Sequence, residues 1–187
     1  MGKEFLLCQG VSVNGAENMK SCYCVENDGI SGLLSYDIIM DMAKEFIKLI
    51  DEPVFFFLEL PKNEEDGEGY DVYYLDNCTK EVALAIVKRY GELLANDGLS
   101  RFGFGSHKTD EEIYFRDYQE FMIYSQNLKK LSKLMQELEI EETDKAMSMW
   151  DLFTSENPGC CSAVELNGET VFDIPDNLKS AGMYKAD

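Results

Sequence analysis

The apolar positions along the chain change their spacing several times, and each change predicts a new element. Between residues 31 and 50 they fall three or four residues apart, the spacing of one face of an amphipathic helix. Pro53 follows this segment, at a point where a helix cannot continue. Val54–Leu60 (VFFFLEL) is then apolar at nearly every position, which predicts a central strand buried on both faces.

The rest of the chain continues this alternation of strands and helices. An acidic loop at residues 62–69 leads into a strand, Tyr70–Leu75, and then into a helix that Asn77 or Thr79 would cap. The remaining predicted elements are strands over Phe5–Cys8, Ser21–Val25, Arg101–Ser106 and Tyr118–Tyr124, an acidic turn at residues 110–112, helices from Asn127 and over Thr143–Phe153, a hairpin over Ala163–Ile174 and a last helical turn near residues 176–181. Asn167-Gly168 favours the type I′ turn of that C-terminal β-hairpin.

This order of elements predicts an α+β fold, a mostly antiparallel sheet with helices packed on it. The same interval, 48 residues, separates Phe56 from Phe104 and Tyr70 from Tyr118, which suggests a duplicated strand–strand–helix unit. Residues 21–106 have the element order of a ferredoxin-like portion, an order that implies no particular activity. We interpret residues 1–187 as a single domain, with residues 140–187 as a candidate appendage.

Charge narrows the range of partners. The 187 residues carry a formal net charge of −19, which argues against nucleic acid, because phosphate binding needs a basic surface. No apolar run approaches the roughly 18 residues of a membrane span, and the first residues lack the apolar core of a signal peptide. An acidic chain of this kind fits either a basic protein partner or simply high solubility, and we predict a cytoplasmic location.

The cysteines predict no metal or redox site. Their spacing contains one Cys-x-Cys and one adjacent pair, neither accompanied by a second pair or a nearby histidine as zinc sites require. We therefore interpret them as reduced thiols and predict no cofactor. The six are Cys8, Cys22, Cys24, Cys78, Cys160 and Cys161.

The most distinctive chemistry lies between Arg101 and Tyr124. Gly103 and Gly105 alternate with phenylalanines, and glycine inside a strand indicates that another group packs very close. The only histidine, His107, follows directly. An enzyme centred here would use His107 with Glu111, Glu112 or Asp117, either as a general base oriented by a carboxylate or as ligands of magnesium or manganese. The plainer alternatives, a surface histidine and a solvated acidic turn, are more common.

Aromatic residues concentrate on the strand pairs, beside acidic segments. Exposed tyrosines rimmed by carboxylates would form a binding surface for a cationic partner. The residues predicted to bind are Glu64, Glu65, Asp66, Asp110, Glu111, Glu112, Tyr114 and Tyr118.

No catalytic pattern outweighs its plainer alternative. We therefore interpret the chain as an acidic interaction protein that binds, and in its sharpest form inhibits, a basic protein partner. In charge, size and expected compartment it resembles bacterial immunity proteins that neutralise toxins, without sharing a motif with them. The His107-centred enzyme and a small-ligand sensor built on the ferredoxin-like portion remain alternatives, and the sequence leaves the oligomeric state open.

Overall fold

A nine-stranded sheet forms the centre of the molecule in the computed structural model, which describes residues 4–27, 29–63, 65, 67–145 and 147–186. From edge to edge the strands are β11 (Tyr184–Lys185), β5 (Tyr70–Cys78), β4 (Val54–Pro61), β6 (Arg101–Ser106), β7 (Glu111–Phe115), β8 (Glu120–Tyr124), β3 (Gly29–Leu33), β2 (Cys22–Glu26) and β9 (Glu141–Glu142). Among the strands of the described residues, only β2 and β9 pair in parallel, and β1 (Val11–Ser12) pairs with β10 (Cys160–Cys161) in a separate two-stranded sheet. The predicted α+β fold with a mostly antiparallel sheet is confirmed.

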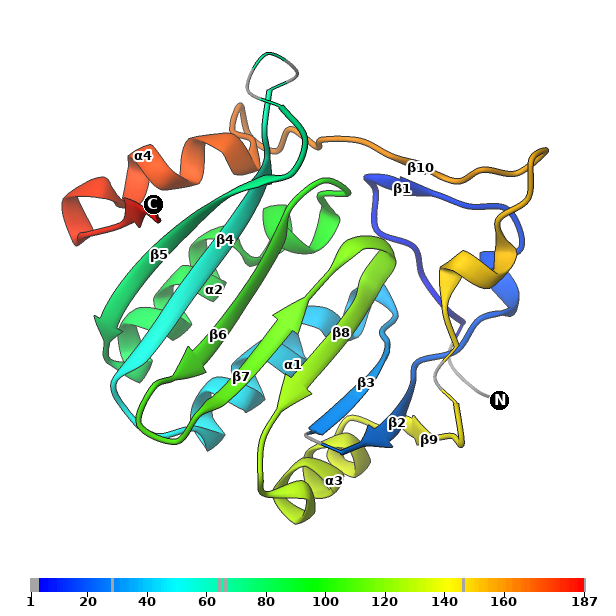
Figure 1. Ribbon diagram of the computed structural model, residues 1–187, viewed down its shortest axis with the longest axis horizontal. Coiled ribbons are helices and arrows are strands. Elements are labelled where there is room, and N and C mark those ends of the chain that lie inside the picture. The colour runs from blue at the N-terminus through cyan, green and yellow to red at the C-terminus, as the bar shows by residue number, and fades with distance from the viewer. Residues whose placement is uncertain (1–3, 28, 64, 66, 146, 187) are drawn as a thin grey trace.

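The long helices cover one face of this sheet. In Figure 1, α1 (Tyr36–Leu49) and α2 (Lys80–Asn96) lie behind the strands, α3 (Leu128–Glu137) lies below β3 and β2, and α4 (Ile174–Leu178) lies beside β5. In the part of the chain that the structure describes, no α-helix crosses the face turned toward the viewer. Nor does any described helix combine the length and apolar character that a membrane crossing needs.

Alternate residues of the central strands are buried on opposite faces of the sheet. On β4, Phe56 and Leu58 are fully buried against the helices, and Phe55 and Phe57 are buried on the opposite face. This arrangement confirms the prediction of a central strand buried on both sides. A second apolar cluster lies against the ends of β2 and β3, where Leu33 joins side chains from residues 5–19 and from Met149.

The start of α1 is later than predicted. Gly29–Leu33 forms β3, and α1 begins only at Tyr36, after Ser35. A Cβ atom on Gly32 would lie 2.1 Å from the backbone oxygen of Cys22, so this glycine allows β2 and β3 to approach closely. The helix-like spacing at this point arises because neighbouring strand residues are divided between the two apolar clusters.

The predicted acidic turn is also partly wrong. The turn occupies residues 107–110, and Glu111 already begins β7, which the sequence did not predict. The second unit therefore has three strands before its helix, whereas the first has two. Phe56 and Phe104 pair directly across β4 and β6, so their interval marks neighbouring strands. Because β7 and β8 lie between β6 and β3, the strands of residues 21–106 are not contiguous in the sheet.

Several smaller predictions can also be checked. Asn167 and Gly168 have the positive φ angles of a type I′ turn, 54° and 79°, but the hairpin predicted over Ala163–Ile174 is reduced to the single bridge between Leu166 and Glu169, because Val171–Asp173 is a 3₁₀ helix and Ile174 begins α4. Thr79 and Asn127 cap α2 and α3 as expected, and Asn77 does not act as a cap. Phe5–Cys8 forms no strand. In Thr143–Phe153, apart from Ala146, which lies outside the described residues, the only helix is the short 3₁₀ segment Met149–Leu152.

Candidate functional site

The uncovered side of the sheet carries a row of aromatic side chains, which we call the open face. It is the side of β5, β4, β6, β7 and β8 opposite α1 and α2, and its central cross-strand row is Tyr74, Phe57, Gly103, Tyr114 and Met122. A Cβ atom on Gly103 would lie 2.4 Å from the Phe57 ring, and one on Gly105 would lie 2.4 Å from the Phe55 ring. The close-packing groups that the glycines predicted are therefore the two phenylalanine rings on β4.

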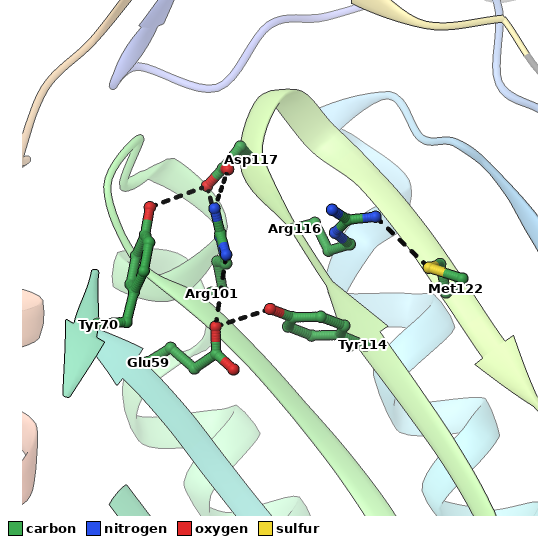
Figure 2. A network of polar contacts seen from close by, with 7 residues as sticks. All are labelled: Glu59, Tyr70, Arg101, Tyr114, Arg116, Asp117 and Met122. Atoms are coloured by element: carbon green, nitrogen blue, oxygen red, sulfur yellow. Dashed lines mark hydrogen bonds and ion pairs between the residues drawn. The ribbon is translucent and has the colours of Figure 1, made fainter. Parts of the chain in front are cut away.

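Arg101 organises one end of the open face, which we call the arginine end: Glu59, Tyr70, Arg101 and Asp117 (Figure 2). The Arg101 guanidinium donates to both Asp117 oxygens, at 2.9 and 2.5 Å, and lies 3.7 Å from Glu59 Oε2. Its carbon Cζ is 4.0 Å from the centre of the Tyr70 ring. One arginine is thus held between two carboxylates and an aromatic face.

The surroundings of the arginine end reinforce this pairing. The hydroxyl of Tyr114 donates to Glu59 Oε2 at 2.7 Å, and burial together with that carboxylate raises the pKa of Tyr114. The hydrogen bonds to Asp117 raise the pKa of Arg101, so its positive charge persists at any ordinary pH. Arg116 lies nearby, with its Nη1 atom 3.5 Å from Met122 Sδ (Figure 2). Every carboxylate at this end therefore has a cation beside it.

A pocket of about 410 Å³ occupies the other end, which we call the histidine pocket. Its lining residues are Phe55, Tyr74, Asp76, Ser106, His107, Asp110, Glu111, Glu112, Tyr124 and Tyr184. The His107 imidazole is stacked on the Phe55 ring, with centroids 4.4 Å apart and planes 21° apart. Its side chain is 73% exposed, so the ring lies at the rim of the pocket.

The carboxylates of the histidine pocket are poorly paired. Asp76 Oδ2 accepts a hydrogen bond from Tyr184 at 2.6 Å, but Asp76 Oδ1 is buried without a hydrogen-bond partner, 3.6 Å from His107 Nε2. Burial raises the pKa of Glu112, Glu59 adds to the rise, and His107 opposes it. Among the described residues, no Lys or Arg forms an ion pair with Asp76 or Glu112. Lys108, beside His107, pairs with Asp51 instead.

The structure brings only part of the enzyme alternative together. His107, Glu111 and Glu112 all line the histidine pocket, but the Glu111 carboxylate is already engaged: it accepts a hydrogen bond from Ser125 at 2.8 Å and lies 3.7 Å from Lys130. Asp117 belongs to the arginine end. The described residues contain no group of three metal-ligating side chains placed to hold a metal ion.

The predicted binding residues are spread over three places. Asp110 and Glu112 line the histidine pocket, and Tyr114 lies in the central row of the open face. Tyr118 packs edge-on against Trp150 and Phe153, away from this row, and burial raises its pKa to about 12. Glu65 is exposed in the loop between β4 and β5, and Glu64 and Asp66 lie outside the described residues.

Sequence reasoning missed the residues that define both ends, above all Glu59, Asp76 and Arg101. Glu59 is the only charged residue within the apolar run of β4, and an ionised side chain in such a run needs a partner. That signal was readable, but the identity of the partner depends on the register between β4 and β6, which places Arg101 opposite Glu59.

Comparison with known proteins found no relative of this chain: no family model, no curated protein and no solved structure matches it.

Proposed function

We propose that this protein binds a basic protein through the open face and thereby masks a functional surface of that partner. The observation that carries the proposal is the imbalance within the face: Asp76 and Glu112 lie among aromatic rings without an ion-pairing Lys or Arg of the described chain. A basic partner would supply the missing charge. The proposed setting is cytoplasmic, in the manner of an immunity protein.

Composition and shape support the same proposal. Tyr124 and Tyr184 border the histidine pocket and are 41% and 50% exposed, and large aromatic side chains with polar tips favour protein interfaces. A net charge of −19 attracts a basic partner over long distances and accelerates encounter. The enzyme alternative has less support, because its four residues are divided among different surroundings.

The test begins with capture of proteins from the native host lysate on the immobilised chain, at low and at high salt, identified by mass spectrometry. We expect a basic protein that is retained at low salt and weakened at high salt. Its association rate is then measured with the purified proteins. Asp110→Lys combined with Glu112→Lys should slow association and flatten its dependence on salt.

A matched control carries the same change of charge on the helical layer. Asp41 and Glu45 lie on α1 with side chains 61% and 39% exposed, so Asp41→Lys combined with Glu45→Lys alters net charge equally. We expect this control to reduce the association rate much less, because it leaves the open face unchanged. Equal slowing by both pairs would show that net charge, and not the open face, governs binding.

A further inference from the structure

The arginine end shows how this fold holds a guanidinium group. Arg101 lies over the Tyr70 ring and is flanked by Glu59 and Asp117. The arrangement needs a flat aromatic surface, two carboxylates and a position sheltered enough to strengthen the contacts; the Arg101 side chain is 22% exposed.

The histidine pocket contains the same parts without the arginine. Asp76 and Glu112 supply two carboxylates, and the partly exposed Tyr74 and His107 supply flat ring surfaces. Asp76 Oδ1 is a buried acceptor with no hydrogen-bond donor, an arrangement that costs free energy; the exposed imidazole of His107 lies 3.6 Å away, and a ligand would reach this oxygen once the groups that cover it shift. The volume of about 410 Å³ lies within the range of about 300–1,000 Å³ typical of ligand sites.

We propose that the histidine pocket binds a guanidinium group, and that an arginine side chain of the basic partner provides it. This inference rests on the proposed function and adds to it the anchoring residue of the partner. A guanidinium fits better than an ammonium because it is planar, stacks on aromatic faces and donates to two carboxylates at once. His107 already stacks flat on Phe55 and covers that ring, so the partly exposed Tyr74 and the outer face of the imidazole are the flat surfaces left for a guanidinium.

The experiment uses N-acetyl-arginine amide as the probe, at low ionic strength, with the full chain. The chain has one histidine, so the imidazole Cε1–H of His107 gives one NMR signal that reports directly on the pocket. We expect a saturable shift of this signal, with a dissociation constant on the order of 1–10 mM, as for one side chain alone. The citrulline amide, which has nearly the same shape without the charge, should cause no shift, and the lysine amide should bind more weakly.

Three variants connect the shift to the pocket carboxylates. Asp76→Asn and Glu112→Gln should each weaken arginine amide binding by about fivefold or more. Glu45→Gln removes the same charge from α1 and should leave the affinity unchanged within about twofold. Equal responses to citrulline or lysine amide, or equal weakening by Glu45→Gln, would overturn the assignment of a guanidinium site.

The outcomes also separate this inference from the proposed function. If arginine amide leaves the imidazole signal unmoved while the Asp110 and Glu112 reversals still slow a basic partner, the pocket proposal fails and the proposed function stands. If arginine amide binds but no basic protein is retained from the lysate, the proposed function fails, and with it the assignment of the arginine to a protein partner.

Discussion

The two ends of the open face contain the same chemical groups in different states of completion. At the arginine end, Glu59 and Asp117 share Arg101, which lies over Tyr70. At the histidine pocket, Asp76 accepts a hydrogen bond from Tyr184 and lies 3.6 Å from the exposed His107 imidazole, and no Lys or Arg of the described residues forms an ion pair with Asp76 or Glu112. Both ends use β4, β5 and β6, but the second carboxylate of the arginine end, Asp117, follows β7, whereas that of the histidine pocket, Glu112, lies within β7.

This difference suggests that the arginine end serves the stability of the fold and that the histidine pocket serves binding. An aromatic and acidic surface whose charges are already paired stabilises the fold and offers little to a partner. The same surface without its cation costs the fold some stability, and a partner that supplies the cation recovers it. Substitutions at the arginine end should therefore mainly change the free energy of unfolding. Substitutions at the histidine pocket should mainly change the affinity for a partner.

The largest expected effect follows removal of the arginine. Arg101→Met should lower the free energy of unfolding by about 3 kcal/mol, because it leaves Glu59 and Asp117 close together without their cation. Urea denaturation at pH 7 measures the loss. Arg101→Lys keeps the charge but not the two-pronged geometry, and should lose only about 1 kcal/mol. The loss in Arg101→Met should shrink at acid pH, where the stranded carboxylates are protonated; a loss independent of pH would mean that packing, not charge, is responsible.

The next largest effect is expected from the two glycines of β6, Gly103 at the centre of the open face and Gly105 beside the Phe55 ring of the histidine pocket. Gly103→Ala places a Cβ atom 2.1 Å from the backbone oxygen of Ile113, which the sheet cannot easily move, and should cost about 2–3 kcal/mol. A Cβ atom on Gly105 would lie 2.4 Å from the Phe55 ring and 2.8 Å from the backbone oxygen of Glu111, so its backbone overlap is smaller and Gly105→Ala should cost less, about 1–2 kcal/mol. Urea denaturation of both variants measures the order, and equal losses would contradict it.

These glycines show what the sequence could and could not reveal. Alternation of Phe and Gly predicted a close neighbour on one face of β6, and the run VFFFLEL predicted a strand buried on both sides, because both signals are local. Register is not local. It brings Gly103 beneath Phe57 and Arg101 beside Glu59, and no spacing within one strand contains that information.

The missed elements have a related cause. Glu111 and Glu112 looked like a solvated turn, but they begin β7, because Ser125 and Lys130 from distant segments accommodate the buried Glu111 carboxylate. Asp76 went unnoticed at the end of a tyrosine-rich strand, where its neighbours in space are Tyr184 and His107. A site built from β5, β7 and the C-terminal strand becomes visible only once the sheet order is known.

A smaller effect, of opposite sign, is expected at Glu112. The pKa of Glu112 is raised in the folded chain, because burial disfavours its charged form. Its contribution to stability is therefore present at acid pH and is lost as the pH rises through the raised pKa. Glu112→Gln should therefore raise the free energy of unfolding by about 0.5 kcal/mol at pH 7 and change it little at pH 3.5. The gain should accompany the loss of arginine amide binding. A destabilising effect at pH 7 would instead place an unrecognised cation beside Glu112.

The smallest change in stability is expected when a substituted residue of the chain itself supplies the guanidinium group to the histidine pocket. His107→Arg places a guanidinium at the rim between Asp76 and Glu112, where the native imidazole is 73% exposed, so unfolding should change by no more than about 0.5 kcal/mol. Binding should change far more, because the new side chain competes for the same carboxylates. With backbone amide signals of Glu112 as the measure, we expect His107→Arg to weaken arginine amide binding and His107→Gln to preserve it. Undiminished binding in His107→Arg would mean that the probe contacts some other part of the open face, and the likeness between the two ends would then be one of composition alone.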